Sequence, residues 1–132
     1  MPPPRSALPA ITLWKRILAA PYGGIVEECL CRLFLMSVIA WVLAKVLFRQ
    51  RAILPRWLFW LAIGVSAVLF GVGHLPAAVS LWPVTSVVVL RTVALNSIGG
   101  FVFGWIFWRW GLEYAVISHF CADVVIHGFG SA

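Results

Sequence analysis

The chain has 132 residues, of which 63% are hydrophobic and 11% are charged, and ten Lys and Arg residues against four Asp and Glu give a net charge of +6. Water-soluble domains usually contain roughly 45–50% apolar and about 25% charged residues, so the composition excludes a soluble protein, and with it the nucleic-acid binding that a basic soluble chain would indicate. We expect one compact membrane domain, because a chain of this length has room for about four spanning helices of roughly 20 residues each.

Residues 1–21 are predicted to be an N-terminal tail, because they contain a run of prolines and scattered basic residues with only short apolar pieces between them. The charged, apolar and small-residue layout of a cleavable signal is not evident there, so we expect the first spanning helix to insert the protein. Residues 22–132 are assigned to a single intramembrane domain.

Four apolar segments of that domain predict an all-α, polytopic membrane bundle of about four transmembrane helices. Their approximate bounds are 24–48, 57–75, 84–108 and 112–128. We expect the second segment to end at about Leu75, because Pro76 follows and proline does not continue a helix. Tryptophans at the start of the second segment and the end of the third are predicted to share one interfacial belt: Trp57, Trp60, Trp105, Trp108 and Trp110.

All four acidic residues lie within or at the edge of the apolar segments, where a charge costs several kcal/mol and is seldom kept without a use. At a rise of about 1.5 Å per residue, Glu27 lies roughly one turn inside the first span and His74 near the far end of the second. In the fourth span His119 lies near mid-depth, with Asp123 one turn further along. Because successive spans alternate in direction, we expect these four side chains to converge in one leaflet.

Two spacings indicate how the charged residues share their helices. Glu28 and Arg32 are four residues apart, so they lie on one face and can form a pair that lowers the cost of burying both. His119 and Asp123 repeat the spacing. Glu27 is rotated by about 100° from Glu28, so we expect one carboxylate to hold Arg32 while the other faces a different cavity.

These segments resemble the motifs of a known family. EECLCR at 27–32, FGVGH at 70–74 and HFCAD at 119–123 match, in order and interval, the EExxxR, FxxxH and HxxxN/D motifs of the CAAX-protease and bacteriocin-processing (CPBP) family of intramembrane proteases, and the chain is similar to type 2 CAAX prenyl proteases. The resemblance covers residues 22 to about 126. It implies an intramembrane endopeptidase, multi-pass in the bacterial inner (plasma) membrane, which hydrolyses peptide bonds of membrane-associated peptides or proteins.

The resemblance also implies residue roles. Glu27 is the general base on an attacking water, and His74 and His119, with Asp123 in the last motif position, orient that water or stabilise the oxyanion. Glu28 and Arg32 support the site. Asp123 departs from members that carry Asn, and an ionised carboxylate cannot donate a hydrogen bond to an oxyanion.

Two explanations for Asp123 stay open, a buried protonated carboxyl group or a divalent metal. The metal would be zinc, held by nitrogen and oxygen donors of Glu27, His74, His119 and Asp123. There is no HExxH motif in the sequence to support a standard zinc site.

Several further residues have structural interpretations. Asn96, in the middle of the third span, is expected to support the site by bonding across helices. Gly99, Gly100 and Gly104 are expected to let helices approach closely. Arg91 belongs to no motif, so we interpret its side chain as reaching toward lipid headgroups.

Functions other than proteolysis also stay open. Relatives usually carry extra spans before the glutamate motif, where this chain has about 20 residues of tail. The chain could therefore be a catalytically reduced member that acts as an immunity or scaffold protein. Alternatively, it could shield its polar site from lipid by forming a homo-oligomer. A small ion or proton pathway would need polar residues along the full membrane depth. The expected partners are membrane lipid and a peptide or membrane-anchored protein substrate.

Overall fold

The computed structural model describes residues 21, 23–49 and 53–129, with side chains as far as Ile126. The tail predicted for residues 1–21 lies outside the described residues, apart from Pro21. Throughout the described part the regular structure is helical and contains no strand, which confirms the predicted all-α class.

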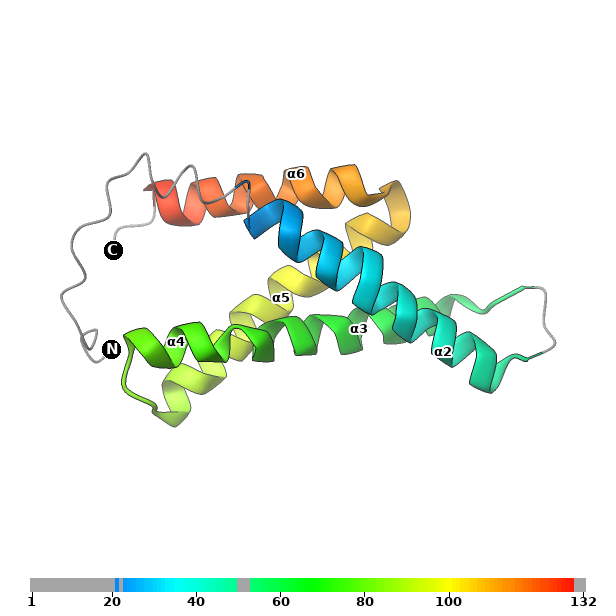
Figure 1. Cartoon of the computed structure of the whole chain (residues 1–132), viewed down its shortest axis with the longest axis horizontal. Helices are drawn as coiled ribbons and strands as arrows, with labels where there is room; N and C mark the ends of the chain where they lie inside the picture. The colour runs from blue at the N-terminus through cyan, green and yellow to red at the C-terminus, as the bar shows by residue number, and fades with distance from the viewer. Residues whose placement is uncertain (1–20, 22, 50–52, 130–132) are drawn as a thin grey trace.

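The described elements run in the order η1, α2, α3, α4, α5, α6 and η2 (Figure 1). Their bounds are η1 Cys29–Met36, α2 Ser37–Leu47, α3 Arg56–Gly73, α4 Leu75–Leu81, α5 Ser86–Trp110, α6 Leu112–Asp123 and η2 Val124–Phe129. Among the described residues three continuous helices are long and apolar enough to cross a membrane, Gly23–Leu47, Arg56–Leu81 and Ser86–Trp110. Helix α6 with η2 is the fourth, shorter helix of the predicted bundle.

The second spanning helix does not end at Pro76, so that prediction was wrong. Helix α3 ends at Gly73, His74 forms a turn, and α4 continues the same span to Leu81. Pro76 lies in the first turn of α4, where a backbone N–H would have no partner within the helix, and proline is therefore tolerated there. Helix α4 therefore extends the span beyond the proline that was expected to end it.

Glycines bring α3 and α5 into close contact. A Cβ atom on Gly100 would lie 3.1 Å from the Cα of Ala67, and one on Gly104 would lie 3.2 Å from Ile63, so the packing role predicted for these two glycines is confirmed. Gly71 was not singled out from the sequence, yet a Cβ there would lie only 2.6 Å from the carbonyl oxygen of Val93. The two backbones touch at the end of α3 that carries His74.

The first helix lies across α3, and its N-terminal half also contacts α6 (Figure 1). Gly24 lies at that second contact, where a Cβ on it would be at ordinary van der Waals distance, 3.4 Å, from the backbone nitrogen of Phe120. At the opposite end of α3, the rings of Trp60 and Trp108 meet edge to face with centroids 5.5 Å apart, as predicted for the aromatic belt. Helices α3 and α5 thus form a central pair, flanked by the two helices that carry the acidic motif residues.

Candidate active site

A buried charge network joins the first helix to α6. The side chains of Glu28 and Arg32 are both 0% exposed, and Arg32 Nε lies 3.1 Å from Glu28 Oε2, so the pair predicted from the spacing is present. The other carboxylate oxygen, Oε1, accepts a hydrogen bond of 2.8 Å from Nδ1 of His119, 91 residues away in the chain. The glutamate is therefore shared between a cation on its own helix and an imidazole on another.

The guanidinium of Arg32 also packs against two aromatic rings. Its Nε is within ion-pair distance of Glu28 but is not aligned for a hydrogen bond, and its Nη atoms have no hydrogen-bond partner among the described residues. The Cζ atom lies 5.0 Å from the ring centroid of Phe70 and 6.0 Å from that of Phe103. The electron-rich faces of such rings attract a cation, which offsets part of the cost of burying the guanidinium.

The network fixes the orientation of His119. Its ring stacks on Phe103 at a centroid distance of 4.6 Å and meets the ring of Phe70 edge to face. Because the carboxylate of Glu28 is paired with Arg32 and acts as an acceptor, Nδ1 carries the proton of their hydrogen bond. The other ring nitrogen, Nε2, is directed into the pocket.

The ring of His74 is also oriented through Nδ1, by a backbone carbonyl at the end of α3. Its Nδ1 lies 2.8 Å from the carbonyl oxygen of Phe70, four residues earlier. That carbonyl is available because the backbone N–H of His74 bonds instead to the carbonyl of Gly71 as α3 ends. A carbonyl only accepts, so Nδ1 donates and Nε2 of His74 is free to face the pocket. The FxxxH spacing therefore has a direct structural use.

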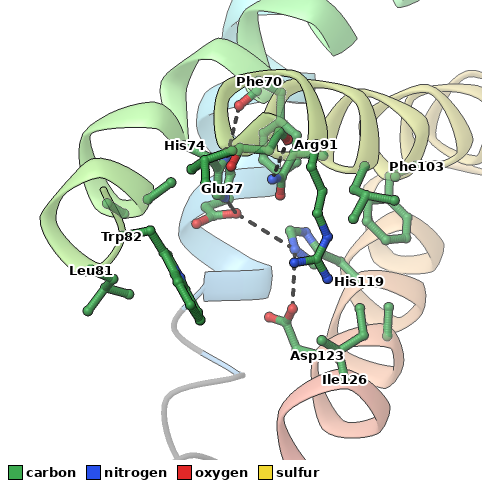
Figure 2. Close-up of a pocket in the computed structure, with 18 residues that line it drawn as sticks. Glu27, Phe70, His74, Leu81, Trp82, Arg91, Phe103, His119, Asp123 and Ile126 are labelled. Atoms are coloured by element: carbon green, nitrogen blue, oxygen red, sulfur yellow. Dashed lines mark hydrogen bonds and ion pairs between the residues drawn. The ribbon is translucent and has the colours of Figure 1, made fainter. Parts of the chain in front are cut away.

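Both free imidazole nitrogens face one carboxylate oxygen. Glu27 Oε2 lies 3.8 Å from His74 Nε2 and 3.7 Å from His119 Nε2, and His119 Nε2 lies 3.8 Å from Asp123 Oδ1. Figure 2 shows these side chains pointing toward one another. The separations exceed the length of a direct hydrogen bond and are of the kind that a bridging water spans. The side chain of Glu27 is 37% exposed and lines the pocket.

These groups line a cavity of about 580 Å³, within the roughly 300–1,000 Å³ that is usual for ligand sites. Apart from its ionisable residues, much of the cavity wall is apolar and comes from α4 and the segments around it. The apolar lining includes Ala77, Ala78, Leu81, Trp82, Val88, Leu95 and Ile126. The cavity therefore combines a polar end with an apolar wall.

The structure brings together all four residues for which the sequence predicted convergence. Asn96 also lines the cavity, but its Nδ2 donates to the carbonyl oxygen of Thr92 in its own helix, at 2.8 Å, so the expected bond across helices is replaced by one within α5. Gly99, expected to serve packing, lines the cavity as well.

Arg91 is the residue that the sequence interpretation missed. Its side chain lines the cavity instead of only reaching toward headgroups, and Figure 2 shows it extending from α5 toward His119 and Asp123. The signal was present, because Arg91 lies five residues inside α5, close to the depth at which Glu27 enters the first helix. Spacing alone did not say which way its long side chain turns.

The sequence left open whether the site binds a divalent metal, and the side chains that line the site can be compared with the ligands that zinc prefers. Carboxylate oxygens and imidazole nitrogens are ligands that zinc accepts. However, no group of three or more His, Cys, Asp or Glu side chains within the described ranges is arranged to hold a metal ion. The four residues thus offer donors that zinc accepts, but not the arrangement of a metal site in this structure.

Comparison with protein families gives one match over nearly all of the chain. A family described as Type II CAAX prenyl endopeptidase Rce1-like matches residues 9–125. The chain belongs to the Rce1-like family. The matched region contains Glu27, His74, His119 and Asp123, and membership confirms the resemblance to CAAX proteases drawn from the motifs. No curated protein and no solved structure matches this Rce1-like chain. Family and helices together indicate an integral membrane peptidase.

Proposed function

We propose that this Rce1-like protein is an intramembrane endopeptidase in which Glu27 activates a water for attack on a peptide bond. The observation that carries the proposal is the approach of both histidine Nε2 atoms to one oxygen of Glu27, at 3.7 and 3.8 Å. A water bound there would touch a proton acceptor and two imidazoles at once, and catalytic groups must lie within hydrogen-bond reach of the proton that they move, directly or through one water.

The proposed reaction is ordinary amide hydrolysis. Glu27 takes a proton from the water as the water oxygen bonds to the carbonyl carbon of the substrate, and the carbonyl oxygen becomes an oxyanion. The same carboxyl group then delivers its proton to the amide nitrogen, the carbon–nitrogen bond breaks, and the products are a carboxylic acid and an amine. One glutamate thus serves as base and then as acid, as in other hydrolytic cycles with a single carboxylate.

The histidines are the candidate oxyanion donors. Each is held through Nδ1, His74 by the carbonyl of Phe70 and His119 by Glu28, so each ring can present Nε2 without rotating. When a ring carries a second proton, its Nε2–H can donate to the oxyanion, and donors fixed in advance need no reorganisation during the reaction. The carboxylate of Asp123 then lies beside the charged ring of His119, and no direct bond from Asp123 to the oxyanion is required.

The surroundings of the site support a membrane-associated substrate. The cavity opens among spanning helices, and its apolar wall can hold the apolar side chains of a peptide or of a membrane-anchored protein. We place the protein as a multi-pass component of a bacterial inner membrane, surrounded by lipid.

The test is cleavage of a peptide library by the full chain purified in detergent. Glu27→Gln is expected to lower kcat by about 10²–10⁴-fold, the usual contribution of a general base. The matched control is Glu113→Gln, an exposed glutamate in the first turn of α6, which is expected to leave kcat unchanged. Cleavage by Glu27→Gln at the wild-type rate would remove the assigned base.

The same assay addresses the metal and the alternative function. A loss of cleavage in a chelator that is restored by added zinc would establish a metal-dependent mechanism and replace the one proposed here. If the wild-type protein binds peptides but cleaves none, it is the catalytically reduced immunity or scaffold member that the sequence left open.

A further inference from the structure

Arg91 is a charged residue of the cavity to which the proposed mechanism gives no role. Of the residues that line the cavity, it alone is a lysine or arginine, and two of the others, Glu27 and Asp123, are acidic. Figure 2 shows its guanidinium pointing toward the ring of His119 and the carboxylate of Asp123. Three helices therefore meet at this point, with Arg91 on α5, His119 and Asp123 on α6, and Glu27 on the first helix.

The carboxylate of Asp123 has a defined setting. Its Oδ1 lies 3.8 Å from His119 Nε2, and its Oδ2 faces Gly23 on the first helix, where an added Cβ would lie 3.4 Å away. The side chain is 19% exposed, so water screens it only in part. Two carboxylates that share a partly dry cavity repel each other, and a permanent cation between the helices offsets that repulsion.

We propose that Arg91 is a positioning residue of this site. Its guanidinium holds the carboxylate of Asp123 beside Nε2 of His119, where the negative charge stabilises the doubly protonated ring, while Glu28 orients that ring through Nδ1. The planar guanidinium suits this task because it binds a carboxylate through a fixed fork of donors. The inference rests on the proposed function, since the positioned histidine acts in that reaction.

The role explains why an aspartate can work in the last motif position. A carboxylate that stabilises a charged imidazole needs only its negative charge, and Arg91 holds it in place. An asparagine there would need no counter-charge. The effect of removing Arg91 is therefore expected to depend on whether residue 123 carries a charge.

The test is a double-mutant cycle on peptide cleavage by the full chain in detergent. Arg91→Gln is expected to lower kcat by about tenfold or more with KM changed less than about twofold, and Arg91→Lys is expected to recover part of the loss. In an Asp123→Asn background, adding Arg91→Gln is expected to change kcat by less than about twofold. The matched control, Arg109→Gln in the last turn of the same helix, is expected to match the wild type.

The thermal unfolding of the same variants provides a measurement that does not require activity. The Tm losses of Arg91→Gln and Asp123→Asn are expected to be non-additive in the double variant, because the two side chains interact. Multiplicative losses of kcat together with additive losses of Tm would overturn the proposal.

A second outcome would also overturn the proposal: Arg91→Gln raises KM without changing kcat, and does so only for peptides with a free terminal carboxylate. Arg91 would then bind the substrate instead of positioning His119. Glu27→Gln, measured in parallel, separates this outcome from a failure of the proposed function: if that variant cleaves normally, the mechanism itself is wrong.

Discussion

Glu28 offers the sharpest test of how the buried network works. The substitution Glu28→Gln keeps the shape of the side chain and removes its charge. It leaves Arg32 buried without a counter-ion, 0% exposed and packed between aromatic rings, and it changes the 2.8 Å acceptor for His119 Nδ1 from a carboxylate to an amide. Removing one partner of a buried ion pair typically costs about 3–5 kcal/mol. We expect a loss near the lower end, about 3 kcal/mol, because the amide oxygen can still accept one hydrogen bond.

The catalytic effect has a separate physical cause. The amide group can present either oxygen or nitrogen to Nδ1, so the ring is no longer held in one protonation pattern. A comparable carboxylate-to-amide change behind a catalytic histidine costs about 10⁴-fold in kcat. Since His119 shares its task with His74 here, we expect about a 10²-fold loss, which falls within the usual range for one acid–base group.

The two effects can be separated with a second variant. Glu28→Gln combined with Arg32→Met removes both charges, and replacing a buried ion pair by neutral groups of similar volume is often neutral for stability. We expect the double variant to recover most of the lost free energy of unfolding, while kcat stays low because His119 still lacks its carboxylate. Unfolding in detergent, followed by tryptophan fluorescence, and cleavage of the same peptide measure the two quantities.

The result that refutes this reasoning is equally defined. If Glu28→Gln unfolds within about 0.5 kcal/mol of the wild type, as exposed substitutions usually do, the network does not stabilise the bundle. If kcat recovers with stability in the double variant, Glu28 acts only through the fold and does not orient His119.

Two other predictions concern the C-terminal end of α3. Gly71→Ala is expected to destabilise the bundle by about 1–3 kcal/mol, because a Cβ there would lie 2.6 Å from the carbonyl oxygen of Val93. The control is Gly64→Ala, which is expected to be neutral or slightly stabilising because a Cβ on Gly64 would meet nothing within 4 Å. Equal unfolding transitions for the two variants would contradict the close approach of α3 and α5. His74→Phe is expected to lower kcat by about 10–10²-fold with little change in Tm, because it removes Nε2 and the bond to the Phe70 carbonyl while filling the same space, and an unchanged kcat would show that His74 has no part in the reaction.

Much of the fold could be predicted from the sequence, because hydrophobic length and residue spacing are properties of position along the chain. Hydrophobic length and composition set the membrane class and the helical segments, since a continuous apolar segment of about 20 residues can satisfy its backbone groups in a bilayer by forming a helix. The convergence of Glu27, His74, His119 and Asp123 followed from the rise per residue and from alternating directions. The pairing of Glu28 with Arg32 followed from a local spacing and is present in the structure.

Other features depended on how the helices rotate and pack. The sequence could not show that the second oxygen of Glu28 binds His119, because their contact spans 91 residues and requires two helices to face each other at one angle. It could not show that α4 continues beyond Pro76, because a proline that blocks one helix is acceptable in the first turn of the next.

The direction of Arg91 is the clearest case of what tertiary structure decided. A long, flexible side chain near a helix end can reach headgroups or an interior cavity, and the sequence is the same for both. By itself the sequence predicted how far along its helix each charged group lies, because that position is counted along one helix. Only the packing of α5 against its neighbours determined which groups face one another, because the rotation of a helix about its axis is set by the side chains that it meets on other helices.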